Sequence, residues 1–210
     1  ALRGHTEAIF STAFSAEGKR LASASYDKTV RIWNVPTGEE VLTLQGFSEG
    51  QYCAAFSPDG RRLASGGMDQ TIQMWDLATG QKVLAFPRHT ARIMSLSFSV
   101  DGRQLVSVSG NDTAIVWDVV TGQPLFTLHD RTTSIRCAAF TPDGQRLATG
   151  NLQWGMHLWD ATTGENVFTF PRQNSLIWAL TFSPDGHRLV SAAADGTLRV
   201  WDATPRGSGS

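Results

Sequence analysis

A tryptophan recurs at one fixed interval along this chain of 210 residues. Each member of the series stands 42 positions after the last: Trp33, Trp75, Trp117, Trp159 and Trp201. Asp follows in four of the five places, and Asn34 stands in the fifth. Self-similarity at such a period is the signature of a repeat architecture, in which one supersecondary unit is stacked along the chain. The sequence therefore predicts five copies of one unit.

Each unit is predicted to contain four short strands. The first repeat shows the runs AIFSTAFS, RLASAS, TVRIW and EEVLTLQ, each bounded by Gly, Pro, Asp or Asn. An Asp-Gly turn after the first run recurs at 59–60, 101–102, 143–144 and 185–186, where its carboxylate has a structural role. The first run ends on a repeated phenylalanine: Phe14, Phe56, Phe98, Phe140 and Phe182. One four-stranded sheet cannot bury such an apolar surface alone, so the next sheet must cover it.

These residues resemble the WD-repeat family of β-propellers, and the resemblance covers nearly all of the chain. It implies an all-β fold, a β-propeller or propeller segment of five four-stranded antiparallel blades, the fifth lacking most of its outer strand. We place the blades at about 4–45, 46–87, 88–129, 130–171 and 172–204, within one unit of residues 1–204. Residues 205–210 are interpreted as a flexible linker or a cloning scar.

The resemblance also implies a hydrogen-bonded set of His, Ser or Thr, Asp and Trp inside each blade. Its members here are His5, Ser23, Asp27, Trp33, Ser65, Asp69, Trp75, His89, Ser107, Trp117, Trp159, Ser191, Asp195 and Trp201. Phe47, Arg131 and Gln173 stand in place of His, and Asn111 and Gln153 stand in place of Asp. We therefore expect the set to be complete in the first blade and absent in the fourth.

In the WD-repeat family the usual binding surface is the rim that carries the Gly-His and Asp turns. The column five places after the His position reads Phe10, Tyr52, Met94, Arg136 and Trp178. Aromatic residues, Met and Arg are the types enriched in binding hot spots. Further candidates on this rim are Tyr26, Met68, Arg92, Leu152 and Trp154. The alternative is that large residues near a propeller axis plug the channel or pack between blades.

Charge and cysteine content limit the classes of partner. A formal net charge of -1 provides no basic field for nucleic acid or an anionic membrane, so we expect neither. Cys53 and Cys137 occupy one column two repeats apart, which predicts small buried thiols and a reducing, intracellular setting. We find no apolar run long enough to span a bilayer and no signal-peptide pattern, so we expect a soluble cytoplasmic protein.

The sequence does not predict an enzyme. The five histidines show no metal-ligand spacing, and no nucleophile, base and orienting group converge in one column. We expect no catalytic residues, no metal and no cofactor.

Two functions remain open at this stage. The first is a protein- or peptide-binding scaffold that uses the rim, with Arg92 and Arg136 available to acidic groups. The second is an engineered or excised repeat array that self-assembles head-to-tail through incomplete end blades. Residues 1–3 are in register with the outer-strand tail at 43–45, so they are candidates to complete the fifth blade. Closure as a monomer, closure as a multimeric ring and an open array all stay possible.

Overall fold

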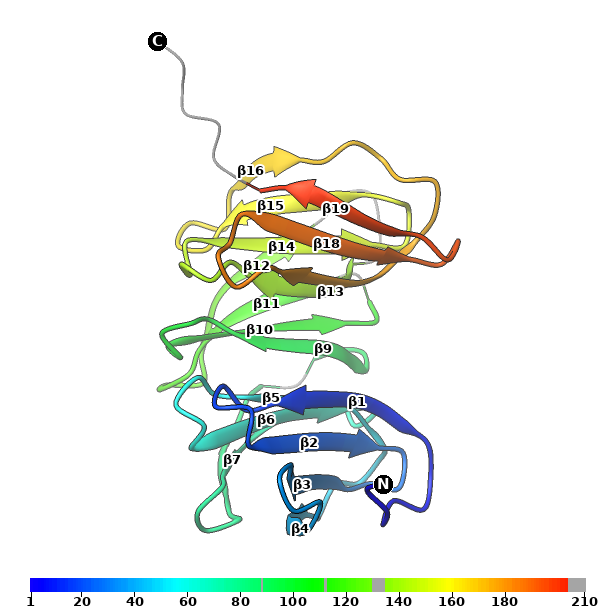
Figure 1. Cartoon of the computed structure of the whole chain (residues 1–210). Coiled ribbons are helices and arrows are strands. Elements are labelled where there is room, and N and C mark those ends of the chain that lie inside the picture. The colour runs from blue at the N-terminus through cyan, green and yellow to red at the C-terminus, as the bar shows by residue number, and fades with distance from the viewer. Residues whose placement is uncertain (88, 112, 130–134, 204–210) are drawn as a thin grey trace.

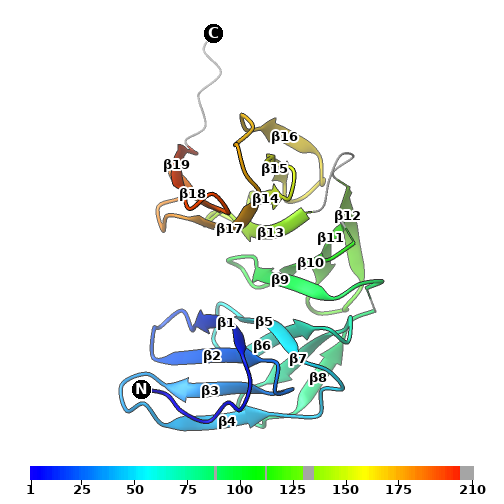
Figure 2. The same cartoon turned by 90° about the vertical axis from the view of Figure 1, so that its right-hand side faces the viewer.

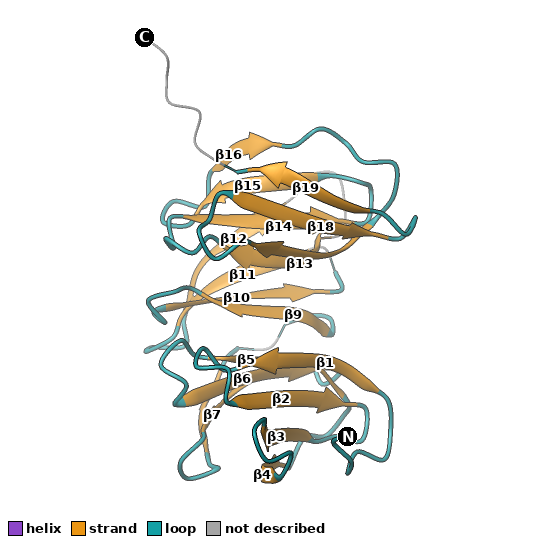
Figure 3. Ribbon diagram, viewed as in Figure 1, coloured by secondary structure: helices purple, strands orange, loops and turns teal. Residues whose placement is uncertain are grey.

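A computed structural model describes residues 1–87, 89–111, 113–129 and 135–203. Arg131 and the tail at 205–210 lie outside these ranges. The regular secondary structure in these ranges consists of β-strands, and the strands form five antiparallel sheets (Figure 3). The structure thus confirms the all-β fold and the five blades, with three strands in the fifth sheet. Among the described residues, it contains no helix of the length and apolarity needed to cross a membrane.

The strands follow the same order in each blade. Blade 1 contains β1 (Ile9–Phe14), β2 (Arg20–Ser25), β3 (Val30–Asn34) and β4 (Glu40–Leu44). Blade 2 contains β5 (Gln51–Phe56), β6 (Arg62–Gly67), β7 (Ile72–Asp76) and β8 (Lys82–Ala85). Blade 3 contains β9 (Ile93–Phe98), β10 (Gln104–Ser109), β11 (Thr113–Asp118) and β12 (Pro124–His129). Blade 4 contains β13 (Ile135–Phe140), β14 (Arg146–Asn151), β15 (Met156–Asp160) and β16 (Asn166–Thr169). Blade 5 contains β17 (Ile177–Phe182), β18 (Arg188–Ala193) and β19 (Leu198–Asp202).

The turn between the first two strands of a blade is held by its own side chains. In blade 2, Ser57 Oγ donates to Asp59 Oδ1 over 2.5 Å, and the Arg61 amide donates to the same oxygen over 3.0 Å. Gly60 takes a φ of 66°, a conformation that disfavours residues with a side chain. The hydrogen bond from Ser57 and that from the Arg61 amide lower the pKa of Asp59. The carboxylate is therefore a structural part of the turn.

Neighbouring blades bury one another through two different faces. Phe56, Leu63 and Trp75 of blade 2 lie in one buried cluster with Ala22, Val30 and Ile32 of blade 1. Corresponding clusters join blades 2 and 3, 3 and 4, and 4 and 5. The face that carries the Trp and Phe columns, here called the Trp face, thus packs on the aliphatic face of the blade before it. Each blade depends on its neighbours for most of its apolar burial.

The array has one free face at each end. Blades 1 and 5 lie at opposite ends of the array in both views (Figures 1 and 2). On the Trp face of blade 1, Phe14 is 64% exposed, whereas its counterpart Phe56 is 8% exposed. On the aliphatic face of blade 5, Leu198 and Val200 are 73% and 59% exposed, whereas Val30 is fully buried. These two faces do not cover each other in this structure.

The first residues of the chain lie on blade 1. Leu2 approaches Gly38, and Gly4 lies against Arg31 and Trp33. The sheet of blade 5 has the order β17-β18-β19, so residues 1–3 do not complete it in this structure. Residues 2–5 line a pocket together with Trp33 on the Trp face of blade 1, whereas Phe14 on the same face stays exposed.

Both cysteines are buried and free, as the repeat spacing predicts. Burial raises the pKa of the Cys137 thiol to about 12 and raises that of Cys53 as well. The two thiols are therefore protonated apolar fillers of the sheet.

We predict that Trp117→Ala lowers the free energy of unfolding by about 3–5 kcal/mol. Trp117 is 2% exposed, and its indole Nε1 donates to Ser107 Oγ over 2.7 Å, so the change leaves a cavity and removes one buried hydrogen bond. Urea denaturation followed by circular dichroism measures the loss. Trp154→Ala is the matched control, because Trp154 is 47% exposed, and we expect it to change stability by less than about 1 kcal/mol. Equal losses for both variants would contradict the assignment of core and rim.

Candidate functional site: the bulged rim of the blades

The inner strand of every blade contains a β-bulge at the same place. In blade 1, Ile9 pairs with Ser25 and Ser11 pairs with Ala24, which leaves one residue between them without a partner. The residues skipped in this way in the five blades are Phe10, Tyr52, Met94, Arg136 and Trp178. A bulge disrupts the ladder locally and re-aims a side chain. The column singled out in the sequence is thus the set of bulged residues.

The bulges lie at the end of the blades that carries the turns with Tyr26, Met68 and Leu152. The Tyr26 amide donates to the Ala8 carbonyl over 2.9 Å, and the Met68 amide donates to the Gly50 carbonyl over 3.0 Å. These bonds tie each turn to the start of the inner strand of its blade. We call this end, with its bulges and turns, the rim.

Three aromatic side chains meet on the rim of blades 1 and 2, and we call them the aromatic corner. The rings of Phe10 and Tyr52 are 4.7 Å apart at an interplanar angle of 84°, and those of Phe10 and Tyr26 are 6.2 Å apart. Such edge-to-face contacts suit the quadrupoles of the rings. Phe10 remains 54% exposed and Tyr26 43% exposed. Large apolar surface is therefore presented to solvent in one place.

A second group lies on the rim of blades 4 and 5. The guanidinium carbon of Arg136 lies 4.7 Å from the centre of the Trp178 ring, which is a cation–π contact. Arg136 is half-buried, and Trp178 is 50% exposed. Burial lowers the pKa of Arg136, and the neighbouring charge of Arg92 lowers it further. Arg136 is therefore a partly desolvated cation held against an aromatic ring.

Trp154 occupies a backbone conformation that is unfavourable for it. Its φ is 74°, and the corresponding turn positions hold Lys28 at 64°, Gln70 at 64° and Gly196 at 81°. The fold imposes a left-handed residue at this place, where glycine is favoured and a bulky residue is strained. An exposed Trp in a strained turn position has no evident role in the core.

Among the predicted rim residues, ring and cation–π contacts join Phe10 with Tyr26 and Tyr52, and Arg136 with Trp178. The other predicted rim residues make no ring or cation–π contact with a described residue: Met68, Arg92, Met94, Leu152 and Trp154. Met68 and Met94 are half-buried on blades 2 and 3, and Leu152 is 38% exposed beside Trp154 on blade 4.

The hydrogen-bonded set is complete in blade 1. His5 Nδ1 lies 2.7 Å from Asp27 Oδ2, and His5 Nε2 lies 2.7 Å from Ser23 Oγ, which also accepts from Trp33 Nε1 over 2.8 Å. Thr29 Oγ1 donates to Asp27 Oδ1 over 2.6 Å. Burial opposes ionisation of Asp27, but the bonds from Thr29 and His5 outweigh it and lower the pKa to about 2. Sequence reasoning missed Thr29, whose position next to an Asp turn was the available signal.

Every blade keeps the bond between Trp Nε1 and a strand hydroxyl. In blades 2, 3, 4 and 5 the hydroxyl belongs to Ser65, Ser107, Thr149 and Ser191. Blade 4 therefore retains part of the set that its sequence led us to expect to be lost. The His position is filled in different ways: His89 bonds Ser107 over 2.6 Å, and Gln173 donates to Ser191 over 2.9 Å.

The Asp position also varies between blades. The Asp69 carboxylate accepts a hydrogen bond from the Thr71 amide in blade 2, and the Asp195 carboxylate accepts one from the Thr197 amide in blade 5. In blade 4 Asn151 takes this role: its Oδ1 accepts hydrogen bonds from the backbone amides of Gln153 and Gly155 over 3.0 and 2.7 Å. Asn151 is the last residue of β14, two positions before the turn position that holds Asp in blades 1, 2 and 5. Aligning the repeats position by position therefore did not reveal it.

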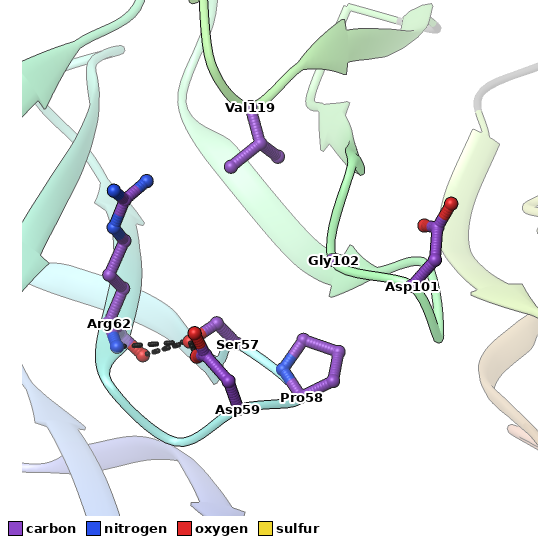
Figure 4. A pocket seen from close by; sticks show the side chains of 7 residues that line it. All are labelled: Ser57, Pro58, Asp59, Arg62, Asp101, Gly102 and Val119. Atoms are coloured by element: carbon purple, nitrogen blue, oxygen red, sulfur yellow. Dashed lines mark hydrogen bonds between the residues drawn. The ribbon is translucent and has the colours of Figure 1, made fainter.

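A polar pocket lies between the turns at the opposite end of blades 2 and 3 (Figure 4). It encloses about 220 Å³, and its lining includes Asp59, Arg62, Asp101 and Val119. The carboxylates of Asp59 and Asp101 accept hydrogen bonds within their own turns. The pocket thus follows from the stacking of structural turns and is remote from the rim. The described residues contain no group of His, Cys, Asp and Glu able to hold a metal ion.

Stacked four-stranded sheets with bulged inner strands define the protein as a β-propeller array. Comparison with known proteins agrees with this class. A family model described as the IFT122 first beta-propeller matches residues 36–209, and one described as WD domain, G-beta repeat matches residues 1–34. The chain belongs to the WD-repeat β-propeller family, whose members are generally protein-interaction scaffolds and typically not enzymes.

Individual relatives match over about one repeat each. HET-E-1, the vegetative incompatibility protein of Podospora anserina, is 51% identical over 37 residues, 18% of this chain and 3% of its own length. Protein Mut11 of Chlamydomonas reinhardtii is 49% identical over 43 residues, 20% of this chain and 12% of its own length. Mouse Coronin-7 is 56% identical over 45 residues, 21% of this chain and 5% of its own length. The aligned stretches thus span only a small part of these relatives.

We predict that His89 makes stability depend on pH between about 6.5 and 4. Burial lowers the pKa of folded His89 to about 4, so the unfolded chain takes up a proton in this window and the folded chain does not. The stabilisation is fully present above the unfolded pKa and is lost as pH falls through the folded one. Its size is on the order of 3 kcal/mol.

Urea denaturation of the wild type and His89→Gln across this pH range measures the effect. Gln173 makes the corresponding bond in blade 5, so the variant is expected to fold and to show a flatter pH profile. His187→Gln is the matched control, because His187 is exposed, and it should keep the wild-type profile. An unchanged slope in His89→Gln would contradict the prediction.

Proposed function

We propose that the chain is a non-catalytic scaffold that binds a protein or peptide through its rim. The observation that carries the proposal is the bulge, which places one side chain of each blade at the same structural position. Those side chains do not repeat, whereas the Trp, Phe and turn columns do. Where the fold repeats a backbone position but leaves its residue type free to vary, that residue can determine which partner is bound.

The chemistry of the rim supports this proposal. Phe10, Trp154 and Trp178 are each about half exposed, and Trp and Tyr are enriched among binding hot spots. Half-exposed aromatic side chains do not fill a channel, which speaks against a plug. The strain at Trp154 points the same way, since strained positions cluster at functional sites.

Selection of displayed random peptides on the purified chain tests the proposal. We expect the selected peptides to lose at least about tenfold in affinity for the double variant Phe10→Ala, Trp154→Ala, which removes two hot-spot side chains. The matched control is Val120→Ala with Arg61→Ala, because both are exposed on turns away from the rim. Both double variants should melt close to the wild type.

Equal binding of the selected peptides to the rim variant and to the wild type would contradict the proposal. A failure to select any peptide with measurable affinity would do so as well.

The exposed end faces favour a second candidate function, head-to-tail self-association. The free aliphatic face of blade 5, with Leu198 and Val200, corresponds to the face on blade 1 that receives Phe56 and Trp75. The free Trp face of blade 1, with Phe14, corresponds to the face that such a surface covers in every internal interface. A second copy would therefore repeat the contact between blades, as a heterologous interface.

Light scattering over a range of concentrations tests this candidate. We expect the wild type to form multimers, and Phe14→Ser and Leu198→Ser each to stay monomeric on its own, since every head-to-tail contact needs both faces and all copies of a variant lack the same one. An equal mixture of the two variants should form dimers, because each supplies the intact face that the other needs. A wild type that stays monomeric at every concentration would contradict self-association and leave the rim proposal untouched.

A further inference from the structure

Arg136 is held on the rim by an aromatic ring and not by an acid. It is the bulged residue of β13, and Trp178 is the bulged residue of the neighbouring β17. The guanidinium lies over the indole at 4.7 Å. A guanidinium stacked on its face keeps its N–H donors free around its edge, because they lie in the plane of the group. The contact thus orients Arg136 without using its hydrogen-bonding capacity.

A second arginine stands on the adjacent blade. Arg92 directly precedes β9, is exposed, and its carbonyl accepts from the Gly110 amide over 2.9 Å. A Cβ added at Gly110 would lie 3.4 Å from Arg92 Cγ, so the stem of Arg92 passes over this glycine. The same turn position holds Tyr26, Met68 and Leu152 in blades 1, 2 and 4. The contact with Gly110 places the stem of Arg92 on the rim of blade 3.

Neither arginine is neutralised within the described part of the chain. The ion pairs found there join His5 with Asp27, Arg20 with Glu17, Lys28 with Glu49 and Arg31 with Glu40. Arg92 directly precedes β9 and Arg136 lies on β13, and these two inner strands pack against each other, so two like charges stand on neighbouring parts of the rim, which is unfavourable in a partly desolvated place. An anion bound between them would relieve this repulsion and fill the free donors of Arg136.

We propose that the rim over blades 3 to 5 binds an anionic group of the peptide partner, a carboxylate or a phosphate, through Arg136 and Arg92. Arg136 supplies the planar fork that matches two oxygens of such a group. Trp178 is a positioning residue that sets the plane of the fork. The inference rests on the proposed rim function and adds the chemical class of the ligand.

Simple repulsion without a ligand is the competing explanation. Arg136 would then cover the Trp178 ring with its guanidinium and long stem, and Arg92 would point into water. This explanation accounts for the stacking, and it predicts that small anions do not discriminate between Arg136 and any other exposed arginine. The two explanations thus differ in what a titration shows.

The test is a titration followed through the arginine Nε–Hε signals of the ¹⁵N-labelled chain. The probes are phenyl phosphate, benzoate and the neutral benzamide. We expect the Arg136 signal, assigned with Arg136→Gln, to shift with one or both anions and not with benzamide. A shift with phenyl phosphate alone indicates a phosphorylated partner, and a shift with both anions indicates that acidic side chains also bind.

Variants distinguish a specific anion-binding site from the general attraction of anions to positive charge. Arg136→Lys keeps the charge but loses the fork, and we expect at least about tenfold weaker anion binding. Trp178→Ala should also weaken binding, whereas Trp178→Phe, which keeps a ring, should restore most of it. Arg103→Gln is the matched control, because Arg103 is exposed on the turn between β9 and β10, away from the rim, and it should change nothing.

An Arg136 signal that no anion moves would overturn the inference, and so would equal anion binding by Arg136→Gln and the wild type. The rim function has a separate readout. Peptides that lose affinity for the Phe10→Ala, Trp154→Ala variant but bind Arg136→Gln normally would leave the scaffold proposal standing and remove only the anion site.

Discussion

The structure depends on one contact that is repeated in every blade. A Trp donates its indole N–H to a strand Ser or Thr, and in blades 2 to 5 its ring packs on the aliphatic face of the blade before. The hydrogen bond fixes the ring within its own sheet, and the packing joins that sheet to the next one. Because a single blade cannot bury this ring alone, stability is distributed over the interfaces between neighbours. The free faces at the two ends follow from the same dependence.

Once the Trp is anchored, the rest of the blade has freedom to change. Phe47 packs on Trp75 with ring centres 5.2 Å apart, and Gln173 bonds the hydroxyl that the His would have reached. A different side chain thus takes the place of the His beside the Trp and its hydroxyl partner in each of these blades. The Gln solution is less complete, since Gln173 Oε1 is buried without a hydrogen-bond partner among the described residues. Loss of the His is therefore tolerated where the Trp–hydroxyl bond remains.

The sequence predicted the blades well because their signals are local. The Trp spacing and the Asp-Gly turns locate the strands within a residue or two, since each turn is closed by its own side chains. The bulge could not be read in this way, because it is a property of pairing between two strands and leaves no special residue type at Phe10 or Arg136. The exposure of Phe14 was equally hidden, since a repeat column looks the same whether or not a neighbour covers it. Asn151 was missed because it replaces a turn residue from a strand position.

The bulge occurs at the same position in all five blades, so every blade presents one inner-strand side chain in the same way. The geometry is constant, so any selectivity must come from the order of side chains along the inner strands β1, β5, β9, β13 and β17, which pack one against the next. That order here runs from aromatic, through Met, to a cation stacked on Trp. The aromatic corner and the positive charge thereby lie on different blades of the array. With the anion site proposed above, a peptide lying across the rim would be recognised in one direction, because reversing it would desolvate its anionic group against the aromatic corner and place its apolar group beside the guanidinium groups of Arg92 and Arg136.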